Sequence, residues 1–358
     1  MNLLLYGIMI VFAFAGFFRN IDNRKQSRLF LIFLIILFCF TVISRQYGYF
    51  SYSDLRSYIW RFINNDNAYF GTGYNILCNI IRSLFGTNIN TYLASISILI
   101  LGIAIISIKV WSGNTQPIFY NTFVLLFVTY WGVVFSSEVI RSGIAIVFSL
   151  LAIALAKEKK IFICIVCIIF SIAFHWTEIF IVPIILLMFI TKDKSKGKIN
   201  TSFFYGWMLI LIFLDIFNFS YIFSEVLNVV LQLIVTQTSQ FEHYLLYLNP
   251  RPRDTLLSFL SPQYIYYRVL ALYLVYIFRK AKSSSILLYS YYIGLSIYTL
   301  MSSFGVVTRM QWIFTVPSIF LLYDYIESDL GLKNNKKIVV TILTVSQSVM
   351  TINYLGFY

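Results

Sequence analysis

Apolar runs recur along almost the whole chain, and short charged or polar loops separate them. A helix of about 20 apolar residues crosses a hydrocarbon core of about 30 Å, and most of the runs approach that length. They lack the alternation of apolar and polar positions that a transmembrane barrel needs. The pattern predicts an all-α, polytopic integral membrane protein with about twelve transmembrane helices, at residues 2–18, 29–44, 89–110, 118–136, 142–156, 161–174, 177–190, 203–221, 263–279, 285–304, 310–327 and 338–356.

The apolar run over residues 161–190 decides the topology. As one straight helix it would be about 45 Å long, which exceeds the hydrocarbon core. Lysine clusters lie on both sides of it, at 157–160 and 192–198. Because basic loops stay preferentially in the cytoplasm, both clusters are expected inside, and the run must cross twice. We expect the turn near His175, either between two short spans or in a re-entrant hairpin buried in protein.

Composition and charge agree with this topology. Hydrophobic residues make up 59% of the chain and charged residues 11%, whereas a soluble protein carries about 25% charged residues. With the N-terminus outside, every lysine falls on the predicted inner side, and the basic residues at the predicted outer ends are all arginine. The net charge of +13 follows from this arrangement and gives no reason to expect a nucleic-acid partner. The first span has no basic start or cleavage site, so it is read as retained.

Two longer segments lie on the predicted outer side of a single transmembrane domain, 1–358. The segment 45–88 mixes aromatic residues, arginine, aspartate and asparagine, and its part 74–85 has the pattern of an interfacial helix. The segment 222–262 begins with an amphipathic stretch and continues with a proline-containing part. Loops placed over a membrane pocket often act as lids or substrate platforms, and we interpret 222–262 in this way.

The candidate chemistry centres on residues 138–178. Glu138 and Arg141 open one apolar run, and His175 and Glu178 follow the next. In the predicted topology all four reach the same outer face, and ionisable groups at membrane depth are costly and usually functional. A neutral imidazole can act as general base on a sugar hydroxyl, or hold one in place. Glu138 is the competing base, and its alternative role is to position Arg141 through a salt bridge.

Arginines at the predicted outer edge point to an anionic ligand. The guanidinium suits phosphate because its planar fork donates two parallel hydrogen bonds and stays charged when partly desolvated. Arg141 and Arg309 open spans, and Arg268 lies about one turn into another, on a tyrosine-rich face. A lipid-linked pyrophosphate fits that position. The structural alternative is that these arginines anchor the protein to lipid headgroups or pair with carboxylates.

The outer segment 45–88 contributes one further candidate group. Asp54 is followed by Arg56 and Tyr58. The carboxylate can bind sugar hydroxyls or an arginine, and aromatic rings can stack on sugar faces. The alternative is that these residues serve only the structure of the loop.

Several functional classes lack their motifs. The chain has no P-loop, which argues against an ATPase, and no HExxH. No span carries the paired carboxylates and histidines of an intramembrane metal site. A ladder of arginines and a selectivity-filter sequence are also missing. Cys164 and Cys167 form a CxxC without a second ligand pair, so we interpret them as helix-packing cysteines.

Four features together carry a resemblance to a known family. They are Asp54 followed by Tyr58 in an early outer loop, the arginine-led span 141–155 with its basic loop, the Phe174-His175 turn, and ten or more spans over most of the chain. In these features the chain resembles the EpsG-like branch of the Wzy-type O-antigen and capsular polysaccharide repeat-unit polymerases. The resemblance implies a metal-independent membrane glycosyltransferase similar to those of the GT-C type, multi-pass in the bacterial inner membrane.

The resemblance also implies a reaction and its partners. Such a polymerase transfers a growing glycan from undecaprenyl diphosphate to a new lipid-linked oligosaccharide repeat on the outer face of the membrane. It uses no nucleotide sugar, no metal and no cofactor. The expected partners are undecaprenyl-diphosphate-linked oligosaccharides and membrane lipids, with a chain-length regulator as a further candidate.

The roles that follow for this chain form one hypothesis. Arginines take the place of a divalent cation and stabilise the charge of the departing diphosphate. The diphosphate is assigned to Arg141, Arg309, Arg45 and Arg268. The proton of the acceptor hydroxyl is assigned to His175 or Glu138. The sugar site is assigned to Asp54, Arg56 and Tyr58.

Two other functions remain open at this stage. A ligase that moves finished glycan onto another acceptor shares the donor chemistry. A flippase for lipid-linked oligosaccharide fits the number of spans, but it predicts polar residues along a path through both leaflets. Asp215 is the clearest charge within a span, and the arginines gather on one side.

Overall fold

The computed structural model describes residues 3–18, 24–47, 54–66, 71–113, 124–191, 199–235, 262–281, 284–302, 307–327 and 333–355. These residues are nearly all helical and include no strand, which confirms the predicted all-α class. The helices form two compact units. The first unit consists of Met1–Thr191 with Ile326–Tyr358, and the second consists of Lys192–Tyr325.

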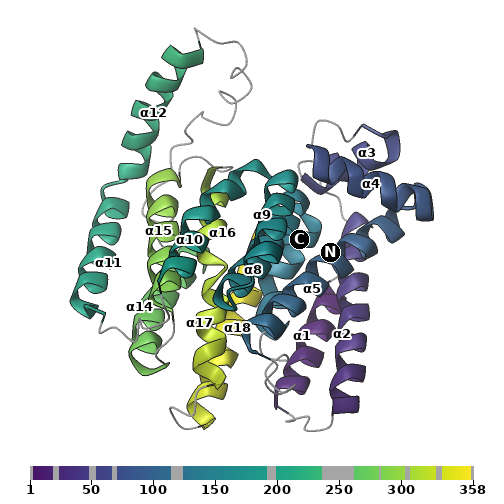
Figure 1. The fold of residues 1–358 in the computed structure, drawn as a ribbon, viewed down its shortest axis with the longest axis horizontal. Helices are drawn as coiled ribbons and strands as arrows, with labels where there is room; N and C mark the ends of the chain where they lie inside the picture. The colour runs from purple at the N-terminus through teal and green to yellow at the C-terminus, as the bar shows by residue number, and fades with distance from the viewer. Residues whose placement is uncertain are drawn as a thin grey trace. The chain divides into compact units, whose positions relative to one another are not determined.

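The first unit contains long apolar helices and a short helical hairpin (Figure 1). Its elements are α1 (Leu3–Phe18), α2 (Arg24–Ile43), η1 (Ser44–Tyr47), α3 (Asp54–Asn64), α4 (Thr72–Phe85), α5 (Ile89–Trp111), η3 (Phe127–Gly132), α7 (Val133–Ser137), α8 (Ile140–Lys157), α9 (Ile161–Phe174), η4 (Trp176–Ile181), α10 (Val182–Ile190) and α18 (Lys333–Leu355).

Helix α8 is the centre of the first unit and packs against α5 and α9. Its small residues let the neighbours approach closely, and Ala145, Ala152 and Ala154 have no exposed surface. The thiol of Cys164 donates to the Ala152 carbonyl at 3.3 Å, and the Ser171 hydroxyl donates to the Ala145 carbonyl at 2.8 Å. Helices α8 and α9 therefore run antiparallel. Small residues favour such contacts because helices in lipid associate through close van der Waals packing.

The apolar run 161–190 folds back on itself at His175. Helix α9 ends there because His175 adopts an extended conformation, with φ −150° and ψ 112°. At the other end of the run, Lys159 Nζ donates to the Met188 carbonyl at 2.6 Å and to the Phe189 carbonyl at 3.2 Å. Lys159 precedes α9 and the two carbonyls close α10, so both ends of the run lie together. The predicted turn is confirmed.

Lysines cap helix C-termini at this end of the first unit. Lys157 Nζ donates to the Trp111 carbonyl, the last of α5, at 2.8 Å, and lies 4.1 Å from the centre of the Trp111 ring. Lys159 likewise donates to carbonyls in the last turn of α10, those of Met188 and Phe189. Cations are favourable at helix C-termini because the last carbonyls lack partners and carry partial negative charge. Two lysines of the predicted inner loops, Lys157 and Lys159, thus have a structural use.

A π-helical stretch, η3, interrupts the helix that was predicted over 118–136, of which the structure describes residues from 124 onward. The carbonyl of Thr129 within it accepts two side-chain hydrogen bonds, from Tyr6 of α1 at 2.7 Å and from Thr351 of α18 at 2.6 Å. Wide helical turns are commonly found at functional or structurally special sites. Here the wide turn joins the N-terminal and C-terminal helices to the middle of the chain.

Helices α3 and α4 form an amphipathic hairpin that packs on the start of α5. Tyr74 and Tyr92 share a hydrogen bond between their hydroxyls, and Tyr58 meets the Tyr74 ring edge-on at 5.5 Å. The Phe62 ring stacks on Tyr92 at 4.3 Å. Arg82 Nη2 donates to the Phe62 carbonyl at 3.0 Å, which ties α4 to α3. The helix predicted near residues 74–85 is confirmed as α4.

The second unit is built from α11 (Thr201–Ile216), α12 (Phe219–Val235), α14 (Pro262–Ala281), α15 (Ser285–Met301), η7 (Val307–Met310), α16 (Gln311–Thr315) and most of α17 (Ser318–Glu327). The chain bends by 76° between α11 and α12, where Asn218 has φ 50°. The helix predicted over 310–327 is divided, because Val316 and Pro317 form a turn between α16 and α17. Residues 236–261, most of the predicted lid, lie outside the described part.

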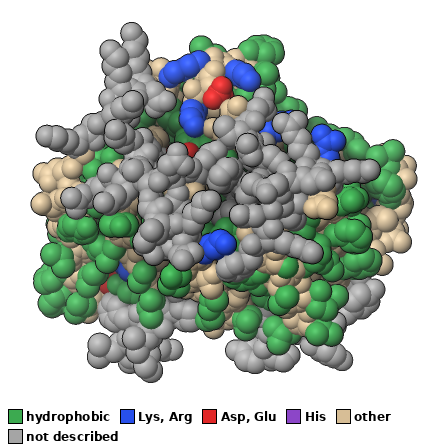
Figure 2. Space-filling view, turned by 90° about the horizontal axis from the view of Figure 1, so that it is seen from below, with side chains coloured by type: hydrophobic (Ala, Val, Ile, Leu, Met, Phe, Trp, Pro, Cys, Tyr) green, Lys and Arg blue, Asp and Glu red, His purple; other side chains and the backbone are tan. Residues whose placement is uncertain are grey.

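Two helices of the described residues, α5 and α8, are long and apolar enough to cross a membrane. The bent pair α11–α12 is a third candidate if it forms one span, and several further apolar helices are 10–17 residues long. Apolar side chains such as Phe162 and Ile190 are 79% and 76% exposed, as a lipid-facing surface requires. Figure 2 shows Lys and Arg side chains gathered on part of one face beside such hydrophobic surface. The count of twelve spans stays a prediction.

Candidate functional site

Four segments of the first unit meet at the end where α9 turns into η4. The antiparallel packing places the last turn of α9 beside the first turns of α8. An ion pair between Arg45 and Glu138 joins the end of α2 to the break before α8. The start of α4 rests on α9, since a Cβ atom on Gly73 would lie only 2.8 Å from the Ala173 oxygen. These contacts bring the predicted polar residues of the first unit to one end of it.

Glu138 lies in the break between α7 and α8 and is 8% exposed, while its partner Arg45, in η1, is 2% exposed. The carboxylate of Glu138 therefore already has a buried cationic partner, the guanidinium of Arg45. Of the two roles weighed for Glu138, base or partner of an arginine, the pairing is the one that the geometry favours. The arginine in that pair is Arg45 rather than Arg141.

Arg141 lies in the first turn of α8, and its side chain is half-buried. Gly143, two residues on, allows α7 to pass very close, because a Cβ atom there would lie 2.4 Å from Phe135 Cβ. A guanidinium at the first turn of a helix lies at the positive end of the helix dipole, and both attract anions. This position suits a phosphate ligand.

His175 terminates α9, and its side chain is half-buried. Its Nδ1 lies 2.5 Å from the Thr177 hydroxyl oxygen. When Nδ1–H donates to that oxygen, Nε2 carries the lone pair that a general base needs. Thr177 therefore orients the ring, which is a role that the sequence alone did not assign to it.

Glu178 anchors the turn that carries His175. Its carboxylate is 1% exposed and accepts a hydrogen bond from Ser149 of α8 at 2.7 Å. The hydroxyl oxygen of Ser149 also lies 2.8 Å from that of Ser171 in α9. The backbone N–H of Glu178 donates to the His175 carbonyl at 3.0 Å. This chain of polar contacts fixes η4 against α8 and α9, and the two serines gave no signal in the sequence because hydroxyls are common inside membrane helices.

The three residues assigned to a sugar site lie on α3. Asp54 is its first residue and is half-buried, which suits a carboxylate because the N-terminal end of a helix carries partial positive charge. Arg56 is exposed, and Tyr58 is buried against Tyr74. The structure therefore gives Tyr58 a packing role, and leaves Asp54 and Arg56 nearer to the surface. Their assignment to sugar remains a proposal.

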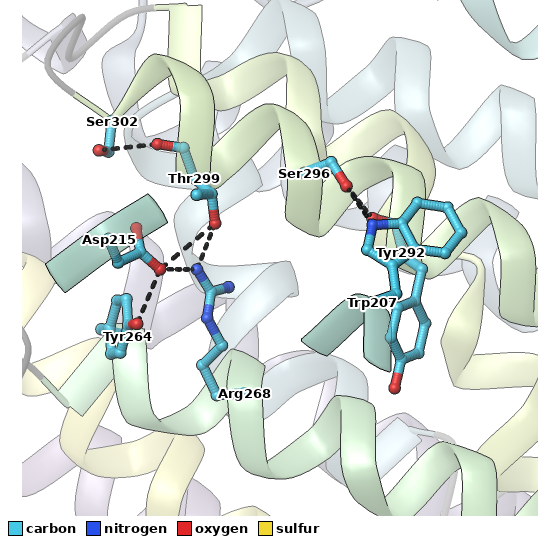
Figure 3. A network of polar contacts seen from close by, with 8 residues as sticks. All are labelled: Trp207, Asp215, Tyr264, Arg268, Tyr292, Ser296, Thr299 and Ser302. Atoms are coloured by element: carbon cyan, nitrogen blue, oxygen red, sulfur yellow. Dashed lines mark hydrogen bonds and ion pairs between the residues drawn. The ribbon is translucent and has the colours of Figure 1, made fainter. Parts of the chain in front are cut away.

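Arg268 and Arg309 belong to the second unit. Arg268 of α14 forms an ion pair with Asp215 of α11 and donates to the Thr299 hydroxyl of α15 (Figure 3). Tyr264, one turn earlier on α14, donates to the same Asp215 oxygen at 2.7 Å. Arg309 is half-buried in η7, which packs against α15. Asp215 was noted in the sequence only as a charge within a span, and its partners are separated from it by long stretches of chain.

No group of three or more His, Cys, Asp or Glu side chains that could hold a metal ion occurs among the residues that the structure describes. The candidate residues are arginines, a histidine and carboxylates, of which Glu138 and Asp215 form ion pairs. Their chemistry suits anion binding and proton transfer.

Comparisons with known proteins bear on the identity of the chain. No curated protein and no solved structure matches it. A family model does match, over residues 29–356, which is nearly the whole chain. This match confirms the resemblance drawn from the outer aspartate, the arginine-led span and the histidine turn. The chain belongs to the EpsG family, and EpsG-like proteins are similar to Wzy-type polymerases.

Proposed function

We propose that the protein is a polysaccharide polymerase that works on the outer face of the bacterial inner membrane. The observation that carries this proposal is the EpsG family match over residues 29–356, which points to a polymerase-like membrane glycosyltransferase. The donor is a growing glycan on undecaprenyl diphosphate, and the acceptor is a lipid-linked repeat. A sugar hydroxyl of the acceptor attacks the anomeric carbon of the donor. The bond to the diphosphate breaks, the lipid diphosphate leaves, and the hydroxyl proton passes to a base.

His175 is the base in this proposal. The support is its place at the end of α9, its half-buried ring, and the Thr177 contact that holds Nδ1. Glu138 is assigned to position the site, because its carboxylate is buried against Arg45. Positioned bases contribute about 10² to 10⁴ in rate. Replacement of His175 by alanine is therefore expected to lower turnover by at least about 10²-fold without loss of folded protein.

The departing diphosphate is assigned to arginines. In the first unit this is Arg141, at the first turn of α8, where backbone N–H groups add to the positive potential. In the second unit, Arg268 and Arg309 are alternative candidates for binding a diphosphate. Arginines in these roles stabilise negative charge that develops as the bond to the leaving group breaks. Asp54 and Arg56 are assigned to the acceptor sugar.

A polymerisation assay tests the function. The purified protein in detergent receives lipid-diphosphate-linked repeat units from its host, in the presence of EDTA, and the products are separated on a gel. A ladder spaced by one repeat is expected from the wild type and not from His175→Ala. A wild type that binds the lipid-linked substrate but makes no ladder would contradict the polymerase and favour a flippase, or a ligase without its acceptor. A ladder that EDTA abolishes would contradict the proposed independence of metal.

A further inference from the structure

Four side chains from three helices converge inside the second unit (Figure 3). Three donors reach a single oxygen, Oδ2 of Asp215. Tyr264 donates to it at 2.7 Å, Arg268 Nη2 forms the ion pair, and the Thr299 hydroxyl lies 3.4 Å away. Arg268 Nη2 also donates to Thr299. The carboxylate and the guanidinium are thus held by the same neighbours.

The burial of this ion pair calls for an explanation. Asp215 is 3% exposed and Arg268 is 5% exposed. Burying two charges has a large desolvation cost, and well-packed apolar residues of similar volume often stabilise a protein equally well or better. Stability alone is therefore a weak reason for a carboxylate and a guanidinium at these positions. A role in fixing the geometry of one of them is a better reason.

The guanidinium of Arg268 is only partly used by its neighbours. Nη2 takes both contacts, with Asp215 and with Thr299. Within the part of the chain that the structure describes, Nε and Nη1 have no hydrogen-bond partner. A guanidinium carries five N–H donors in a fixed plane, so three of them are left for other acceptors. Buried donors without a partner are costly, which points to an acceptor that joins them in the working protein.

Aromatic rings fix the plane in which those donors lie. The Arg268 guanidinium carbon is 4.5 Å from the centre of the Tyr264 ring and 5.9 Å from that of Tyr298. Cation–π contacts of this kind favour one orientation of the guanidinium. The ion pair and the rings together leave Arg268 little freedom to rotate.

We propose that Asp215 is a positioning residue for Arg268, and that Tyr264 and Thr299 hold Asp215 and Arg268 in register. The carboxylate occupies Nη2 and keeps Nε and Nη1 presented to an oxygen of an anionic ligand. The ligand class is the diphosphate of a lipid-linked donor, so this inference rests on the proposed function. Asp215 does not touch the substrate in this account and acts only through Arg268.

A double-mutant cycle tests the proposal on the full-length protein in detergent. The variants are Asp215→Asn, Arg268→Gln and the two combined, and the readout is kcat per folded molecule in the polymerisation assay. If Asp215 acts through Arg268, each single change lowers kcat by at least tenfold, and the double variant is no more than threefold below Arg268→Gln. Losses that multiply would overturn the proposal, because independent sites add in free energy.

Binding of an anionic lipid is a second test, because positioning of Arg268 by Asp215 and competition of Asp215 with the ligand predict opposite changes in Kd. Farnesyl diphosphate serves as the anionic lipid. Removal of a negative charge next to Arg268 should by itself tighten binding of an anion, whereas loss of orientation should weaken it. We expect Asp215→Asn to raise the Kd at least threefold. A lower Kd would mean that Asp215 competes with the ligand instead of positioning Arg268, and would overturn the proposal.

Two further variants keep the test decisive if Asp215→Asn fails to fold. Thr299→Val removes the second Nη2 contact without a change in charge, and Thr299→Ser keeps it. We expect the valine variant to lower kcat and the serine variant to restore it, and an unchanged kcat in Thr299→Val would contradict the proposal. Ser296→Ala is the matched control, since it removes a hydrogen bond from Trp207 at 3.0 Å in the same unit.

The outcomes separate this inference from the function on which it rests. A wild type that neither makes a ladder nor binds farnesyl diphosphate would contradict the proposed function. An active wild type with full activity in both Asp215→Asn and Thr299→Val would contradict the positioning role alone.

Discussion

Replacement of Glu138 by glutamine distinguishes two roles for this carboxylate, general base and buried partner of Arg45. The change keeps the size of the side chain and removes its charge, so the ion pair with the buried Arg45 is lost. Arg45 is 2% exposed and Glu138 is 8% exposed. Loss of one partner of a buried ion pair costs about 3 to 5 kcal/mol, because the remaining charge stays desolvated.

The exposed ion pair between Arg61 and Asp66 is the matched comparison. Its two atoms, Nη1 and Oδ2, are 2.9 Å apart, and the side chains are 22% and 51% exposed. Solvent screens such pairs, and their measured contributions are about 0.2 to 1 kcal/mol. Asp66→Asn should therefore change stability very little, although it breaks an ion pair in the same unit.

Thermal unfolding in detergent, followed by the amount of monodisperse protein that remains, compares these variants. We expect a clearly lower midpoint for Glu138→Gln, almost no change for Asp66→Asn, and partial recovery when Arg45→Gln is added to Glu138→Gln. The recovery follows because the double variant buries no charge. A Glu138→Gln protein as stable as the Asp66→Asn protein but without turnover would refute the reasoning and make Glu138 the base.

Three further predictions follow from other contacts. Gly143→Ala should destabilise the protein, since overpacking against Phe135 Cβ at 2.4 Å costs about 1 to 3 kcal/mol and outweighs the gain of about 1 kcal/mol from alanine in a helix. Thr177→Val should lower kcat and Thr177→Ser should not, as measured in the ladder assay, because only a hydroxyl orients His175. Burial raises the pKa of the Cys78 thiol to about 11. Alkylation of Cys78 in native protein should therefore be very slow at pH 8, and its rate should rise about tenfold for each unit of increase in pH up to 11, because only the thiolate reacts.

Each of these has its own control. Gly102→Ala, in α5, meets no atom within 4 Å and should stabilise the protein slightly, so a loss equal to that of Gly143→Ala would contradict the packing argument. A serine variant of Thr177 as impaired as the valine variant would argue against orientation by the hydroxyl. Rapid labelling of Cys78 in folded protein at pH 8, compared with protein in denaturing detergent by mass spectrometry, would show that the thiol is not buried.

The fold-back at His175 could be predicted because charge constrains it strongly. Two lysine clusters flank a run too long for one crossing, and the contact of Lys159 with the Met188 carbonyl shows that the ends meet. The family, too, was recognisable from short motifs. Helix interruptions were harder to predict. The wide turn at η3 contains a carbonyl that accepts hydrogen bonds from both Tyr6 and Thr351, and such tertiary contacts produce no periodic pattern in the sequence.

The candidate site was predictable in its residue types and less so in its pairings. Arg45 and Glu138 were both singled out, but the sequence suggested Arg141 as the partner of Glu138 because it lies within one helical turn. Asp215 and Arg268 stand on different helices, and nothing in a single sequence links them. Tyr58 looked available for a sugar, but the burial of its ring depends on Tyr74 of the next helix. Tertiary packing decides each of these cases.

The most direct measurement is the initial rate of polymer formation by Arg141→Lys beside its control Arg61→Lys. Lysine keeps the charge and loses the planar fork, so a bidentate contact to the diphosphate is lost at Arg141 alone. We expect a loss of about 10²-fold for Arg141→Lys, as for removal of one donor from an oxyanion site, and a near-normal rate for Arg61→Lys. A normal ladder from Arg141→Lys would contradict the account, because the fork at the start of α8 would then have no part in the reaction.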